Sequence, residues 1–159
     1  MTRKEQYNQL ILQIAGLIKD ETNLVGILAN VSAALHDTFP ERFFWVGFYL
    51  QENGNMLRLG PFQGSVACYV IPFGKGVCGK AWEEERTLIV PDVEKFPGHI
   101  ACSSLSRSEI VVPMYDDSHT FRGVLDIDST QLNDFNEDDK EGLERIIELL
   151  MAETQDLFQ

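Results

Sequence analysis

The sequence contains no apolar run close to the ~20 residues that a membrane-spanning helix requires. Its first residues, Met1 to Gln6, are polar and lead into no apolar stretch of the secretory type. Basic residues are also scarce, because 13 lysines and arginines stand against 25 aspartates and glutamates, for a net charge of −12. Nucleic acids and anionic membranes are bound by basic surfaces, so we expect neither as a partner. The lack of a spanning segment and of a secretory signal leads us to expect a cytoplasmic protein. Acidic runs at 83–85 and 137–144 are interpreted as solvated helix surface.

Cysteine is limited to Cys68, Cys78 and Cys102. An odd number of cysteines in a short chain excludes a secreted disulfide framework. His99 lies three residues before Cys102, but the paired CxxC spacing of zinc sites is absent, so we expect no metal. Residues 74–76, Gly-Lys-Gly, lack the remainder of a phosphate-binding motif, and no cofactor is expected.

The 159 residues, 44% of them hydrophobic, suffice for a single compact domain spanning 1–159. Helical spacing of apolar residues predicts helices over 5–19 and from a cap at Asn23 to Pro40, with a last helix after a cap at Asn136. Strand patterns occur near 43–51, after 55 and at 66–72, 87–91, 108–114 and 121–129, with a short helix from about 76. The links are too short for parallel crossovers. The sequence therefore predicts an α+β fold, a central antiparallel sheet of about six strands with N- and C-terminal helices packed on it.

Three carboxylates interrupt the apolar pattern of the last two strands. Asp126 and Asp128 alternate with apolar residues in "GVLDIDS", and residues two apart on a strand share a face. That face could simply be exposed to solvent. Glu109 opens the preceding strand of the predicted hairpin, so it can lie beside both aspartates. Three converging carboxylates suggest an ammonium site, a shared-proton site or a site for a hard metal.

The thiols and two aromatic residues are further candidates. Cys78 lies near a helix start in "GVCG", where free amides and the helix dipole lower a thiol pKa. Cys102 falls in an accessible loop, whereas Cys68 lies within a predicted strand and is expected in the core. Buried inert thiols are the alternative for all three. Trp45 and Tyr49, four apart on one strand face, serve either core packing or the apolar wall of a pocket.

Four segments together closely resemble the free methionine-R-sulfoxide reductases, a family of stand-alone GAF-domain enzymes: "WVGFYL", "GPFQGSVACYVIPFGKGVCGKA", "FPGHIACSSLSRSEIVVP" and "GVLDIDS". The cysteine spacings of ten and then twenty-four residues also match that family. The resemblance runs from about Trp45 to the last helix. One departure is Ser103, where the family pattern has an acidic residue after the nucleophile.

The resemblance implies reduction of free L-methionine-R-sulfoxide to L-methionine. A cysteine thiolate attacks the sulfoxide sulfur while a carboxylic acid protonates the oxygen, and the resulting sulfenic acid condenses to a disulfide. Thioredoxin then reduces the disulfide, and homodimers are common in the family. The resemblance assigns the nucleophile to Cys102, disulfide formation to Cys68 and Cys78, the pocket carboxylates to Glu109, Asp126 and Asp128, and the aromatic wall to Trp45 and Tyr49.

Two other functions are alternatives to the reductase. The first is a non-catalytic GAF-type sensor of a small molecule, which has no need of three cysteines and three carboxylates. The second is a thiol redox switch without a substrate, which leaves the carboxylates unused.

Overall fold

The computed structural model describes residues 1–158 and contains one six-stranded sheet with four α-helices. Neighbouring strands are antiparallel in the order β3-β2-β1-β6-β5-β4, which confirms the predicted α+β fold. No helix within residues 1–158 combines the length and the apolar character needed to cross a membrane. In chain order the elements are α1 (Arg3–Ile18), α2 (Leu24–Thr38), β1 (Trp45–Glu52), β2 (Met56–Gln63), β3 (Val70–Pro72), α3 (Gly76–Glu84), β4 (Leu88–Val90), β5 (Ser108–Tyr115), β6 (Phe121–Ser129) and α4 (Glu137–Thr154), with short 3-10 turns at Val93–Lys95 and Gln155–Leu157.

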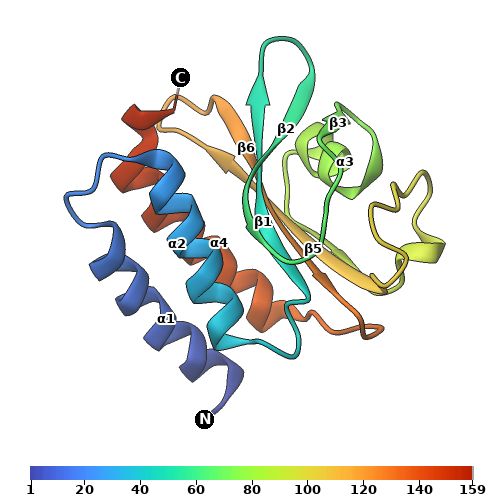
Figure 1. Cartoon of the computed structure of the whole chain (residues 1–159), viewed down its shortest axis with the longest axis horizontal. Coiled ribbons are helices and arrows are strands. Elements are labelled where there is room, and N and C mark those ends of the chain that lie inside the picture. Colours follow the sequence, from blue (N-terminus) through green and yellow to red (C-terminus); the bar gives the residue numbers. More distant parts are fainter. Residues whose placement is uncertain (159) are drawn as a thin grey trace.

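The sheet separates two layers of different character (Figure 1). The long helices α1, α2 and α4 lie on one face, and α3 lies with β3 and the 91–107 loop on the other side. Because side chains alternate along a strand, β1 sends Val46 and Phe48 into the helical core and Trp45 and Tyr49 to the opposite face. The helical layer therefore stabilises the sheet, and the face toward α3 is free to carry polar groups.

Of the two helix caps predicted from the sequence, the structure confirms one in full. The Asn136 side chain accepts hydrogen bonds from the backbone of Asp138 and Asp139, as expected for the start of α4. Asn23 stands at the N-cap of α2, but its side chain makes no capping hydrogen bond, so its predicted capping role is wrong. The interpretation of 137–144 as solvated surface is also wrong at Asp139, whose side chain is 0% exposed.

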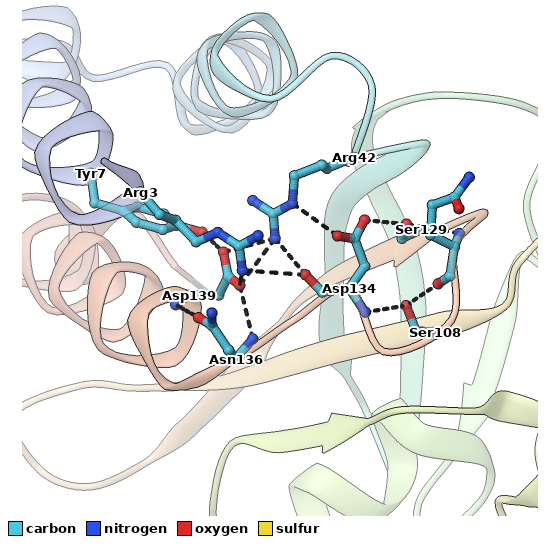
Figure 2. A network of polar contacts seen from close by, with 9 residues as sticks. Arg3, Tyr7, Arg42, Ser108, Ser129, Asp134, Asn136 and Asp139 are labelled. Carbon is cyan, nitrogen blue, oxygen red and sulfur yellow. Dashed lines mark hydrogen bonds and ion pairs between the residues drawn. The ribbon is translucent and has the colours of Figure 1, made fainter. Parts of the chain in front are cut away.

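Asp139 is buried because it is the acceptor of a charged network between α1, α4 and the segment before β1 (Figure 2). Arg3 Nη1 donates to it at 2.7 Å, Tyr7 Oη at 2.7 Å and Arg42 Nη2 at 3.0 Å. Buried carboxylates need such partners, since an unpaired one would cost several kcal/mol. The network ties the N-terminal helix to the C-terminal one.

A second part of the same network holds the open end of the β5–β6 hairpin (Figure 2). Arg42 Nε donates to Asp134 at 3.1 Å, and the Ser129 hydroxyl donates to the same carboxylate. The Asp134 amide in turn donates to Ser108 Oγ at 3.4 Å. Ser108 pairs with Ser129 across the two strands. The network therefore fixes the register of the two strands where the candidate carboxylates begin.

Candidate active site

Strand register brings the three predicted carboxylates together on the face toward α3. Glu109 of β5 lies directly opposite Asp128 of β6. Asp126 is two residues before Asp128 in β6 and therefore lies on the same face of the sheet. Glu109 and Asp126 are buried, so the exposed-face alternative is wrong for these two. The sequence-based prediction that these side chains converge is confirmed.

These carboxylates line a cavity of about 40 Å³ between the sheet, α3 and the loops that carry Cys68 and Cys102. The cavity is lined by Phe44, Trp45, Tyr49, Val66, Ala67, Ile71, Gly76, Val77, Cys78, His99, Ile100, Cys102, Ser103, Ser106, Glu109, Asp126 and Asp128.

A glycine allows close packing of β1 and β2 beside this cavity. Gly47 of β1 lies opposite Asp126 in the sheet. Its missing side chain lets Phe62 approach, since a Cβ there would lie 2.2 Å from Phe62 Cβ.

The aromatic wall also fixes the loop between β2 and β3. Trp45 and Tyr49 stack with ring centroids 5.9 Å apart, as their common strand face predicts. Trp45 Nε1 donates to the Ser65 carbonyl at 3.1 Å, and Tyr49 Oη donates to the Cys68 carbonyl at 3.0 Å. Two pocket residues therefore hold the backbone of the segment that presents Cys68.

Cys68 and Cys102 form a disulfide with their Cα atoms 5.5 Å apart, within the usual range. Cys102 is exposed in its loop, as expected from the sequence. The strand predicted over 66–72 is wrong for its first half, because β3 starts at Val70 and Cys68 lies half-buried in the preceding loop. There its carbonyl bonds to the Tyr49 hydroxyl rather than to a neighbouring strand.

Cys78 departs from its prediction in a different way. It sits in the first turn of α3 as expected, but it is a free thiol buried beneath the cavity. Burial, followed by the negative charge of Asp126, raises the pKa of its thiol well above the usual value. The expectation of a lowered pKa is therefore wrong, because burial among carboxylates outweighs the helix dipole.

Burial also perturbs the carboxylates. It raises the pKa of Glu109 to about 8, with a further contribution from the charge of Asp128. It raises the pKa of Asp126 and of Asp128 well above normal, with the charge of the neighbouring carboxylate adding to each. His99 Nε2 lies 3.7 Å from Glu109 Oε1, and burial lowers the pKa of His99. At neutral pH the cluster therefore holds protons that it can donate to a bound molecule.

Sequence reasoning did not include several lining residues. The sequence suggests His99 only as a weak zinc-ligand candidate beside Cys102, and no motif points to Ser106, yet both line the cavity. The apolar lining residues, such as Ile71, Val77 and Ile100, look like ordinary core positions in the sequence. These three residues share one signal in the sequence, since each lies within three residues of a cysteine.

Comparisons with known proteins agree with this geometry. The GAF domain family matches residues 21–152. The GAF domain-containing protein A of Dictyostelium discoideum is 57% identical over 149 residues, covering 94% of this chain and 92% of that protein. The free methionine-R-sulfoxide reductase of Saccharomyces cerevisiae is 43% identical over 155 residues, covering 94% and 86%.

A solved structure is also similar to this chain, in both sequence and fold. The free methionine-R-sulfoxide reductase of Neisseria meningitidis, in complex with its substrate, superposes with a TM-score of 0.93. It is 46% identical in sequence, and the match covers 98% of this chain and 92% of that one. The likeness spans both layers of the fold and not only the pocket. The chain therefore belongs to the GAF domain family and, within it, to the free methionine-R-sulfoxide reductases.

Proposed function

We propose that this chain reduces free L-methionine-R-sulfoxide to L-methionine at the pocket between the sheet, α3 and the two cysteine loops. The observation that carries the proposal is the Cys68–Cys102 disulfide beside three carboxylates that line one cavity, two of which, Glu109 and Asp126, are buried. A disulfide is the oxidised product expected of a thiol-dependent reductase. The relatives named above as free methionine-R-sulfoxide reductases support the substrate and the preference for the R form.

The pocket lining suits a free amino acid. The aromatic wall of Trp45 and Tyr49 offers an apolar surface for the S-methyl group. The carboxylates of Glu109, Asp126 and Asp128 offer acceptors for an ammonium group. A methionine sulfoxide within a polypeptide has no free ammonium group, and a buried acidic pocket rejects it.

The proposed chemistry begins at Cys102. Its thiolate forms a bond to the sulfoxide sulfur while Glu109, with its pKa of about 8, gives a proton to the sulfoxide oxygen. The oxygen transfers to Cys102, which becomes a sulfenic acid, and methionine leaves. The Cys68 thiol then condenses with the sulfenic acid, releasing water and forming the disulfide.

We assign resolution of the sulfenic acid to Cys68 rather than to Cys78. Cys68 is half-buried in a loop beside Cys102, whereas Cys78 is fixed in α3 and buried. An external dithiol returns both cysteines to thiols by exchange and is itself oxidised to a disulfide. We propose thioredoxin as that dithiol, the cytoplasm as the location, residues 1–159 as the catalytic unit and a homodimer as its assembly.

A coupled assay tests the proposal. The protein is mixed with thioredoxin, thioredoxin reductase, NADPH and racemic free methionine sulfoxide, and NADPH oxidation is followed. We expect oxidation to stop when half of the substrate is consumed, and we expect no oxidation with N-acetylmethionine sulfoxide, which lacks the ammonium group. The Cys102→Ser variant is the inactive control. Absence of turnover with free substrate would favour a non-catalytic sensor of the GAF type.

A further inference from the structure

One group in the pocket has no part in the proposed reaction. Cys78 is buried and free, and its Sγ lies with carboxylate oxygens of Glu109 and Asp126 in a set whose atoms are all within 4.8 Å of one another. Asp126 Oδ1 is buried and has no hydrogen-bond partner within the described residues. We propose that Cys78, Glu109 and Asp126 bind a zinc ion, with His99 as the fourth ligand.

The spacing of the ligand atoms fits zinc after a small contraction. Zn–S bonds of about 2.3 Å and Zn–O bonds of about 2.1 Å in a tetrahedron place sulfur and oxygen roughly 3.6 Å apart. The observed set lies within 4.8 Å, so side-chain shifts of roughly 1 Å bring the three atoms to bonding distance. The ligands come from rigid elements, namely α3, β5 and β6.

His99 is a further nitrogen donor on the wall of the same cavity, outside the set of atoms that lie within 4.8 Å of one another. Its Nε2 lies 3.7 Å from Glu109 Oε1, which is close to the separation of two ligands on one zinc ion. Its side chain is only 15% exposed and lines the same cavity. The loop that carries His99 also carries Cys102, so the fourth ligand can adjust more than the other three.

The donor set selects against other common cations. Calcium and magnesium take six or more oxygen ligands, whereas this cluster offers one sulfur and, with His99, one nitrogen. Thiolate and imidazole ligands favour zinc. The metal displaces protons from the thiol and the carboxyls as it binds, so binding strengthens as the pH rises.

The zinc site shares Glu109 and Asp126 with the proposed substrate site, but in the oxidised chain the cavity suits only the ion. The cavity of about 40 Å³ is far below the ~300 Å³ of typical small-molecule pockets, but it has room for an ion. Val66 at the cavity is 87% exposed, which leaves a route from solvent. Cys78 stays a thiol when Cys68 and Cys102 are joined. If the proposed function holds, zinc also competes with the substrate's ammonium group for Glu109 and Asp126 in the reduced chain.

The test uses the full chain with Cys68 and Cys102 both changed to serine, so that Cys78 is the only thiol. Cobalt(II) is added to the metal-free protein as a spectroscopic probe. We expect one thiolate-to-cobalt charge-transfer band per chain, which one equivalent of Zn²⁺ removes. Adding Asp126→Asn or Glu109→Gln should weaken zinc binding by more than about tenfold, whereas Glu148→Gln, an exposed carboxylate on α4, should leave it unchanged.

The proposal is overturned if no band develops and no zinc binds, or if both carboxylate variants bind zinc as tightly as the parent. Circular dichroism establishes that each variant is folded. Because the two carboxylate variants lie on different strands, the test still applies if one of them fails to fold. Metal binding is measured without substrate, so it is independent of reductase activity. Zinc binding without turnover would contradict only the proposed function, and turnover without zinc binding would contradict only the metal site.

Discussion

Glu109 shows how strongly a side chain's chemistry depends on its neighbours. A glutamate on an exposed strand is ionised at neutral pH, but burial and the charge of Asp128 raise the pKa of this one to about 8. It therefore keeps its proton below that pH and loses it above. Among the three carboxyls it is our choice for the proton donor, because an acid works best with a pKa near the working pH.

This choice predicts a pH profile. The rate of a single turnover by reduced protein should fall as the pH rises through about 8, because the proton that Glu109 donates is then lost. Glu109→Gln should lower the rate by roughly 10²- to 10⁴-fold and remove that decline. Single-turnover methionine release measures this without interference from the reductant. A variant that keeps both the rate and the decline would assign the donor role to another carboxyl.

The two remaining cysteines should behave differently on substitution. Cys68→Ser should release methionine normally in the first turnover and then stop, because the sulfenic acid on Cys102 has no partner. Cys78→Ser should form the Cys68–Cys102 disulfide as the parent does, because Cys78 is outside that bond. Mass spectrometry of the oxidised variants measures the bond directly. If Cys78→Ser failed to form the disulfide, the assignment of Cys68 as the resolving cysteine would be wrong.

At the scale of single residues, the sequence predicts features that depend on the repeat of a strand or helix. It does not predict features that depend on residues that are distant in the sequence and close in space. The shared face of Asp126 and Asp128 follows from the two-residue repeat of a strand. The raised pKa of Cys78 does not follow from its helix position, because its main cause is burial and its second is the charge of Asp126, and both depend on how α3 packs on the sheet. For the same reason no local pattern places Cys78 beside Asp126.

At the scale of helices and strands, a strand is predictable from the sequence where its apolar stretch covers many residues. The strands β1, β5 and β6 each have eight or nine residues and are rich in apolar side chains, and they occur where expected. β3 has three residues, and the apolar residues before it belong to the Cys68 loop. That loop is held by side-chain donors of Trp45 and Tyr49, which a propensity argument does not include.

Two glycines test how closely the helices pack. Gly142 of α4 faces Tyr7 of α1, and a Cβ at this position would lie 2.3 Å from Tyr7 Cγ. Gly142→Ala should therefore cost about 1 to 3 kcal/mol through overpacking. Gly16 of α1 has no atom within 4 Å of such a Cβ, so Gly16→Ala should instead stabilise by about 0.5 to 1 kcal/mol. Urea unfolding measures both, and equal effects of the two substitutions would contradict the packing of α1 on α4.

At the scale of the whole molecule, stability and chemistry are assigned to opposite faces of the sheet. The charged network of Arg3, Arg42 and Asp139 lies among the long helices (Figure 2). The cavity is lined by residues of α3 and of the sheet face toward α3. The sequence predicted the helices on the sheet but treated Asp139 as surface charge. Its charged partners, Arg3 and Arg42, are about a hundred residues away or more, so no local pattern reveals them.

This division predicts a variant that loses stability without losing catalysis. Asp139→Ala leaves Arg3 and Arg42 without their shared partner, and it should lower the free energy of unfolding by about 3 to 5 kcal/mol. Asp138→Ala, the next residue, removes only an exposed contact with Lys4 and should cost less than about 1 kcal/mol. Denaturant unfolding gives the free energies. A large fall in the single-turnover rate of folded Asp139→Ala would show that the two faces are not independent.

The disulfide has a consequence for the order of events during turnover. While Cys68 and Cys102 are joined by the disulfide, the cavity has a volume of about 40 Å³. A second sulfoxide therefore has no place to bind until the reductant has reduced the disulfide. The two substrates therefore never occupy the protein together, and the enzyme alternates between two chemically distinct forms. Double-reciprocal plots at several reductant concentrations should then be parallel lines, the signature of a ping-pong mechanism.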